Sequence, residues 1–225
     1  PIIEMDPSYH YLYITTLRKY AWGNFRQLTK AITIDPAMLA YLDGNENTNR
    51  SPNENYAREL LELFTVGKGP QIGPGDYTNY TEHDIKEIAK VLTGWTDSGM
   101  NRVSNDEGEA HALFQEKFHD QSTKKLSAHF GEEEIPDMGD QEYAYLIDII
   151  FKQAEVARFI SRKLYRWFVY YEIDEQVEAE IIEPMAQVLF EADFDIKPAL
   201  MALLRSEHFY HAQYTGAMIK NPMDF

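Results

Sequence analysis

The fold is decided by residues 51–96, which read SPNENYARELLELFTVGKGPQIGPGDYTNYTEHDIKEIAKVLTGWT. The stretch opens with a strong helix start. Ser51 can act as the N-cap, Pro52 suits the first helical position, and Glu54 stands where a capping box needs it. An apolar run follows and stops at Gly67, a residue type that commonly ends helices. These signals predict a helix that begins at Ser51 and runs to about residue 66.

A second helix start follows at Thr81, with Asp84 in the capping-box position. This helix is expected to end near Leu92, with Gly94 as its C-cap. Between the two helices, residues 68–80 are rich in glycine and proline and predict a plain connector.

Outward from this pair, apolar residues recur near the helical period along most of the chain. The predicted helices cover residues 9–34 with a break at 22–24, a short segment that begins at Asp35-Pro36, residues 141–171, 181–192 and 198–204. Residues 98–118 lack that period, and a loop or a short β-hairpin is expected there. The expected fold class is all-α, an irregular multi-helix domain with long loops that spans residues 1–225 as a single domain.

Composition and charge exclude several kinds of function. The chain has 225 residues and no cysteine, which excludes thiol catalysis, zinc–thiolate sites and disulfides. No apolar run approaches the roughly 20 residues of a membrane span. Seven acidic residues in 131–148 and nine in 172–195, with no Lys or Arg in either stretch, account for the net charge of −16. These two acidic faces repel nucleic acid. They indicate a solvated surface or, alternatively, a docking surface for a protein partner or for calcium.

The polar residues of the first predicted helix suggest a structural cluster. Glu54, Arg58 and Glu62 follow at i, i+4 and i+8 and form a salt-bridge ladder. That ladder leaves Asn53 and Asn55 unexplained. On a helical wheel Asn53 falls near the centre of the apolar face, where a buried amide must be hydrogen-bonded, so we expect it to pin a neighbouring loop. The structural cluster is therefore predicted to contain Asn53, Glu54, Asn55 and Arg58, and the apolar face to contain Tyr56, Ala57, Leu60, Leu63 and Phe64.

An alternative interpretation places chemistry on the same helix. Glu59 and Glu62 lie one turn apart, and two such carboxylates can bridge a metal or share a proton. Further ligands would have to come from elsewhere in the chain. The candidate catalytic residues are Glu59, Glu62, His83 and His119, and the candidate metal ligands are Glu59, Glu62, Asp84, His119 and Asp120. No cofactor is required by the pattern, and a divalent metal is the one that these side chains could hold.

A basic, aromatic-rich segment lies at residues 158–171, RFISRKLYRWFVYY. Interleaved bases and aromatics can stack on nucleic acid. Because the acidic residues 172–195 follow directly, pairing of these bases with the acidic stretch is the preferred interpretation.

Three motifs carry a resemblance to a known family. NENYARELLELFT at residues 53–65, YTEHD at 80–84 and LTGW at 92–95 resemble the bacterial family called domain of unknown function 1800. Shorter matches run along nearly the whole chain, at 22–26, 35–39, 119–124, 157–164 and 219–222. The resemblance implies a largely helical fold, export to the periplasm or the exterior, and no established reaction. Members extend further at both ends, so the chain resembles a core fragment of a longer protein.

The sequence therefore indicates two possible functions. The first is an uncharacterised exported bacterial protein, a helical scaffold with a polar cluster around the NENYARELLELFT helix. The alternative is a metal-assisted hydrolase-like enzyme that uses the Glu, His and Asp residues of that cluster.

Overall fold

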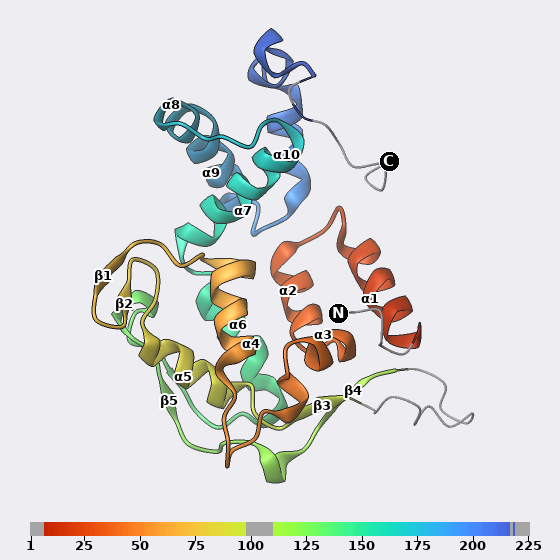
Figure 1. Cartoon of the computed structure of the whole chain (residues 1–225), viewed down its shortest axis with the longest axis vertical. Coiled ribbons are helices and arrows are strands. Elements are labelled where there is room, and N and C mark those ends of the chain that lie inside the picture. Colours follow the sequence, from red (N-terminus) through yellow and green to blue (C-terminus); the bar gives the residue numbers. More distant parts are fainter. Residues whose placement is uncertain (1–6, 98–109, 217, 219–225) are drawn as a thin grey trace. The chain divides into compact units, whose positions relative to one another are not determined.

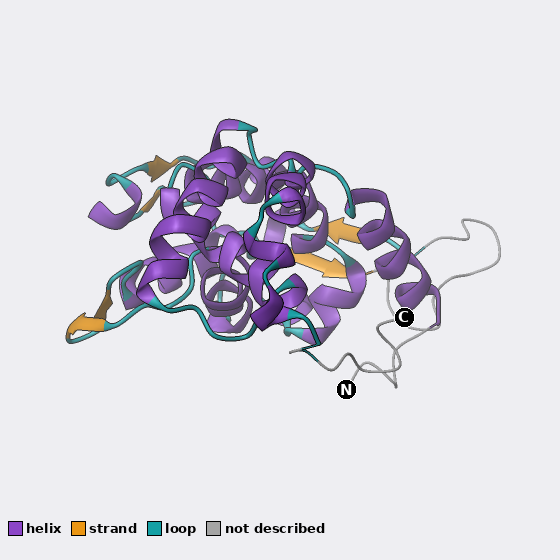
Figure 2. Ribbon diagram, turned by 90° about the horizontal axis from the view of Figure 1, so that it is seen from above, coloured by secondary structure: helices purple, strands orange, loops and turns teal. Residues whose placement is uncertain are grey.

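The computed structural model describes residues 7–97, 110–216 and 218, which are mainly helical with short antiparallel strand pairs (Figures 1 and 2). The predicted all-α class is thereby confirmed. The chain divides into two compact units, Pro1–Ala21 with Arg26–Gln153 and Trp22–Phe25 with Ala154–Phe225. The single-domain expectation stays a prediction, and each unit is described by itself.

The first unit contains the two helices predicted from residues 51–96, together with others from either side of that stretch. In chain order they are α1 (Pro7–Tyr20), α2 (Phe25–Thr33, whose first residue belongs to the second unit), α3 (Pro36–Tyr41), α4 (Glu54–Glu59), α5 (Glu82–Val91) and α6 (Glu142–Ile150). The expected break between α1 and α2 is present, and Asp35 caps α3 with Pro36 at its first position. Thr81 and Asp84 form the predicted capping box of α5.

The start of α4 differs from the prediction. Its N-cap is Asn53, whose side chain accepts a hydrogen bond from the backbone N–H of Asn55 at 2.9 Å. Ser51 does not cap the helix, because its backbone pairs with Thr48 in an isolated bridge. The capping box expected from Ser51 and Glu54 is therefore wrong. Asparagine is as strong an N-cap as serine, and its place two residues later moves the helix start with it.

A π-helix at Leu60–Thr65 continues α4. The N–H of Val66 donates to the carbonyl of Leu61 at 3.0 Å, five residues back, and the hydroxyl of Thr65 donates to the carbonyl of Leu60 at 2.7 Å. The wider turn rotates the following side chains away from a regular helical wheel. Leu63, predicted to lie on the apolar face, is 52% exposed as a result, and that prediction is wrong.

Three antiparallel strand pairs connect the helices of the first unit. They are β1 (Gln71–Gly73) with β2 (Asp76–Tyr77), β3 (Trp95–Asp97) with β4 (Ala112–Phe114), and β5 (Lys124–Lys125) with β6 (Glu134–Ile135). The connector 68–80 thus contains a hairpin. The strand pair expected within 98–118 is correct for β4 alone, because its partner β3 ends at Asp97; residues 98–109 lie outside the described part. In register, Trp95 lies opposite Phe114 and Lys124 opposite Ile135.

The core of the first unit lies where α5 packs against α4 and α6. Fully or almost fully buried side chains fill it, among them Leu60, Leu61, Ile85, Ile88, Leu146 and Ile147. Several buried polar residues sit beside this apolar core, including Thr93, His119, Lys124 and Glu142. A polar group taken out of water must find a partner inside the protein, so these four residues are candidates for a functional site.

The second unit is built from α7 (Ala154–Phe168), α9 (Glu183–Glu191) and α10 (Ile196–Arg205). A short helix α8 (Glu175–Val177) and a second π-helix (Glu178–Ile182) lead into α9, which packs against α7 and α10. The helices predicted at 181–192 and 198–204 are confirmed with slightly different ends. No helix among the described residues combines the length and apolarity needed to cross a bilayer.

The bases of α7 pair with the acidic stretch as predicted. Arg162 binds Glu178 at 2.6 Å and Glu155 at 2.6 Å, and Arg158 binds Glu183 at 2.8 Å. Arg166 instead donates to the carbonyl of Tyr171 at 3.3 Å, and Lys163 lies over the ring of Phe159.

Candidate functional site

The amides at the start of α4 fasten a neighbouring loop. The backbone N–H of Asn53 donates to the side-chain oxygen of Asn47 at 2.8 Å, and the amide of Asn47 donates to the carbonyl of Ala89 at 2.8 Å. Asn55 donates to the carbonyl of Leu42 at 3.2 Å. These bonds join the loop after α3 to α4 and α5, so the asparagines act on the backbone and present no reactive group.

Arg58 is the centre of an ionic network on the same helix. Its guanidinium binds both oxygens of Glu82, at 2.9 and 2.7 Å, which is a bidentate pair. Glu54 at 3.3 Å and Glu62 at 3.7 Å complete the expected ladder, but more loosely. The main partner of Arg58 is thus Glu82, in the first turn of α5. A helical wheel of α4 alone could not show this pair, because the two residues lie on different helices. Hydrogen bonding to Arg58 lowers the pKa of Glu82 below its ordinary value.

The Arg58–Glu82 pair predicts a loss of stability in acid. Because its pKa is depressed in the folded state, Glu82 contributes stability that is present above about pH 4.3 and lost as the pH falls through the folded-state value. Glu82→Gln is expected to lower the free energy of unfolding at neutral pH and to have little effect once the pH is below the folded-state pKa of Glu82. Urea unfolding over this pH range measures it. Glu59→Gln, on the neighbouring turn, is the control, and a similar profile for both variants would contradict the assignment.

Most of the other candidate residues have hydrogen-bond or ion-pair partners of their own. Glu62 accepts from the hydroxyl of Tyr80 and pairs with Lys68 at 3.3 Å. His83 Nε2 lies 2.9 Å from the carbonyl of Lys125. The carboxylate of Asp84 accepts from the backbone N–H groups of Thr81 and Ser127, and that of Asp120 accepts from the N–H of Ser122. Glu59 is half-buried on α4. Of the six candidates only His119 enters the one group of three close metal-ligand side chains found among the described residues.

That group is formed by residues from three different segments of the first unit. His119 follows a single 3-10 turn (Glu116–Phe118), Glu142 is the first residue of α6, and Asp137 lies in the loop after β6. One ligand atom from each lies within 4.8 Å of the others. The side chains of His119 and Glu142 are fully buried, whereas that of Asp137 is 42% exposed. The group therefore has a buried floor and one side open to solvent.

The ring of His119 is held between two acceptors. Nδ1 lies 2.9 Å from the carbonyl oxygen of Thr93, and Nε2 lies 2.9 Å from Oε1 of Glu142. A carbonyl oxygen can only accept, so Nδ1 carries a hydrogen. Neutral histidine has no second N–H to offer, and Nε2 would then direct its lone pair at a carboxylate. The ring is therefore an imidazolium, or it accepts a hydrogen bond from a protonated Glu142, or a bound cation lies between the two groups.

The remaining bonds around this pair fix its orientation. Glu142 Oε2 accepts from Lys124 Nζ at 2.7 Å, and its Oε1 also accepts from the N–H of Met138 at 3.1 Å. Lys124, whose side chain is fully buried, donates in addition to the backbone carbonyl of Asp120. Burial opposes the charged form of His119, but the hydrogen bonds to Glu142 and Thr93 outweigh it and raise the pKa of the ring. A neighbouring positive charge on Lys124 acts in the opposite direction.

The sequence pointed to one member of this site and missed the rest. Glu142 and Asp137 were hidden in the acidic stretch 131–148, where most residues are solvated. The detectable signal was that Glu142 begins an apolar helix, where the positive end of the helix dipole stabilises a carboxylate.

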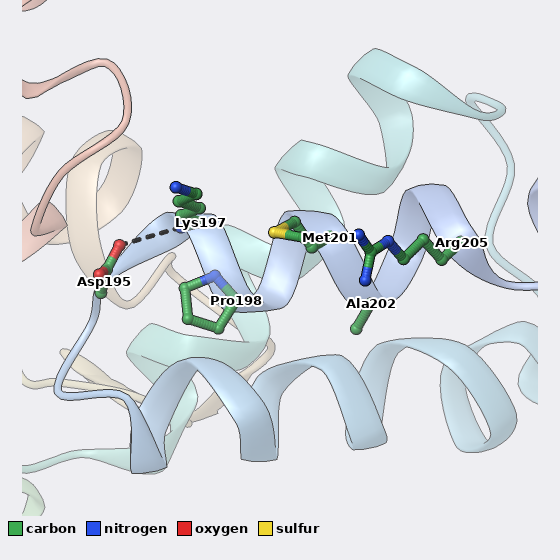
Figure 3. Close-up of a pocket in the computed structure, with 6 residues that line it drawn as sticks. All are labelled: Asp195, Lys197, Pro198, Met201, Ala202 and Arg205. Atoms are coloured by element: carbon green, nitrogen blue, oxygen red, sulfur yellow. Dashed lines mark hydrogen bonds between the residues drawn. The ribbon is translucent and has the colours of Figure 1, made fainter.

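A surface hollow lies in the second unit, along α10. It has a volume of about 470 Å³ and is lined by Asp195, Lys197, Pro198, Met201, Ala202 and Arg205. Figure 3 shows that Lys197, Met201 and Arg205 project from this helix while Asp195 caps its first turn. Its described lining residues include no histidine and no pair of carboxylates, so the His119 group is the better candidate.

Comparison with known proteins gives a family but no activity. Residues 4–225 match the family model described as "Protein of unknown function (DUF1800)". No curated protein and no solved structure matches the sequence.

Proposed function

Because the chain belongs to the DUF1800 family of proteins of unknown function, its family supplies no reaction, and we propose from its own residues that it binds a divalent metal ion. The ligands are His119 Nε2 and one carboxylate oxygen each from Glu142 and Asp137. Zinc suits this mixture of nitrogen and oxygen ligands.

One observation carries the proposal: the nitrogen of His119 that faces Glu142 is the one whose lone pair is free in the neutral ring. Metal-bound histidines commonly donate their other N–H to a backbone carbonyl, which is the arrangement of Nδ1 and Thr93. Two ligands bound at about 2.1 Å lie roughly 3–3.4 Å apart. The Nε2–Oε1 separation of 2.9 Å needs only a slight opening to meet this. Asp137 Oδ1, at 4.0 Å from Nε2, must approach, and its half-exposed side chain has room to turn.

Three protein ligands leave a coordination position for water. Sites of this open kind are characteristic of zinc enzymes, in which the ion lowers the pKa of its bound water and generates a nucleophile. Metal-assisted hydrolysis is therefore the reaction class that we propose. Lys124 holds the second oxygen of Glu142, so Oε1, beside His119 Nε2, is the oxygen that would bind the ion.

The test is metal content together with a variant that spares the buried pair. Purified protein is expected to retain zinc by elemental analysis and to lose several degrees of melting temperature when a chelator removes it. Asp137→Asn is expected to weaken zinc binding about 10- to 100-fold without changing the stability of the metal-free protein. Asp140→Asn, an exposed acid in the same segment, is the control. Equal zinc affinity in both variants, or no zinc binding by the wild type, would disprove the site.

A second candidate function rests on a different observation. With an imidazolium at His119, each charged group of the Lys124–Glu142–His119 network already has a partner. The network then serves only to fix the fold of a non-enzymatic helical scaffold, and the remaining acidic residues of 131–148 and 172–195 provide a surface for a protein partner. Absence of bound metal from the native protein favours this function.

Export from the cytoplasm is proposed from family resemblance alone and is tested by fractionating cells that express the full-length protein.

A further inference from the structure

We propose that the second unit contains a binding cleft for a small organic cation, specifically an alkylammonium group. A cavity of about 340 Å³ lies between the acidic segment that starts at α8 and the two 3-10 turns after α10, His208–Tyr210 and Ala212–Tyr214. Its volume is in the range that accommodates a small ligand. Figure 1 shows α8 and α10 in this unit.

The charge of the cleft is negative. Asp174 and Glu180 line it, and neither Lys nor Arg occurs among its described lining residues. Asp174 uses one oxygen to cap the N–H of Val177 at 2.8 Å, and Glu180 accepts one hydrogen bond from Gln176 at 3.1 Å. Neither carboxylate is neutralised by a basic residue in the ion pairs described. Both line the same cavity as His208.

Aromatic rings also line the cleft. The ring of Tyr214 lies 4.7 Å from that of His208 and 6.3 Å from that of His211, measured between centroids. His208 is fixed by the hydroxyl of Tyr165, 2.9 Å from its Nε2. Burial and the nearby His211 lower the pKa of His208, which favours the neutral form of this ring.

Carboxylates and aromatic rings that line one cavity are a combination that recognises organic cations. An ammonium group gains a charge-assisted hydrogen bond from a carboxylate and an electrostatic attraction from the face of a tyrosine ring. A divalent metal fits less well, because the three-ligand arrangement among the described residues occurs at His119 and not here. An anion is repelled by Asp174 and Glu180. The inference is independent of the metal site, which lies in the other unit.

The binding test uses amines and a neutral isostere. The probes are 1,5-diaminopentane, N-acetyl-lysine methylamide and N-acetyl-norleucine methylamide, titrated into the whole chain by calorimetry. Binding of the diamine alone supports a free amine as ligand, and binding of both amines supports an alkylammonium group that includes a lysine side chain. Equal binding of the norleucine compound, or no amine binding at millimolar concentration, overturns the proposal.

Two variants locate the binding. Glu180→Gln and Tyr214→Leu are each expected to weaken amine binding about three- to tenfold, one by removing a charge and the other by removing the ring. Glu191→Gln, an acidic residue of α9 that does not line the cleft, is the matched control and should bind as the wild type does. Because Glu180 is exposed, its variant should fold even where a Tyr214 variant does not. An unchanged affinity for Glu180→Gln contradicts the cleft.

Discussion

Replacement of Lys124 by methionine is expected to lower the free energy of unfolding by about 3–5 kcal/mol. Lys124 and Glu142 have fully buried side chains, and Nζ lies 2.7 Å from Oε2. Removing the ammonium group leaves the carboxylate of Glu142 in the interior without its closest cation, and the cost of that unpaired charge exceeds the loss of the contact itself. Urea unfolding, followed by circular dichroism, measures the change.

The control is an ion pair of equal length at the surface. Lys152 Nζ also lies 2.7 Å from its partner, Glu133, but the lysine side chain is 61% exposed. Lys152→Met is therefore expected to cost less than about 1 kcal/mol. Since distance is matched, the comparison isolates burial. Similar losses for Lys124→Met and Lys152→Met would show that burial does not determine the strength of this pair.

The second large effect is expected from Gly94→Ala. Gly94 has a φ of 87°, and an added Cβ would lie 3.0 Å from the carbonyl oxygen of Gln115 and 3.1 Å from the Cβ of His119. The left-handed backbone and the crowding together are expected to cost about 2–4 kcal/mol. Because Gln115 is held by a backbone hydrogen bond to Gly94 itself, His119 is the side that must move. A weaker affinity for zinc should accompany the loss of stability.

Gly131→Ala separates the two causes. Gly131 has a φ of 70°, and an added Cβ meets no atom within 4 Å. It therefore has the backbone strain without the crowding, and its expected cost is about 1–2 kcal/mol with unchanged zinc affinity. Thermal unfolding and zinc titration of both variants measure the difference. Equal effects on zinc binding would contradict the role of Gly94 in placing His119.

Local signals predicted much of the fold because they act within a few residues. The Thr81–Asp84 box and the Asp35-Pro36 start depend on bonds that span two or three positions, and both were identified from the sequence. The choice between Ser51 and Asn53 as N-cap was not, because a nearby turn with Thr48 engages the backbone of Ser51. Two caps compete there, and the contact that decides between them lies outside the helix.

The candidate site was less accessible to prediction because its contacts are distant in sequence. Thr93 and Glu142 stand 26 and 23 residues from His119, and no periodic pattern connects such positions. Glu59 of α4 and Glu62 of the π-helix were predicted as a pair because they lie one turn apart, yet Arg58, Tyr80 and Lys68 already bind Glu62. A single buried acid at the start of α6 was indistinguishable by type from its solvated neighbours.

The π turn at Leu60–Thr65 has a consequence for how relatives of this chain are aligned. A turn closed over five residues contains one residue more than a regular turn, so this helix amounts to an α-helix with a single insertion. A relative in which the insertion is missing would show a one-residue gap inside the NENYARELLELFT motif, where a gap is usually treated as an error. Such a gap would mark a real change of helix type and would indicate which members present the equivalent of Leu63 to solvent.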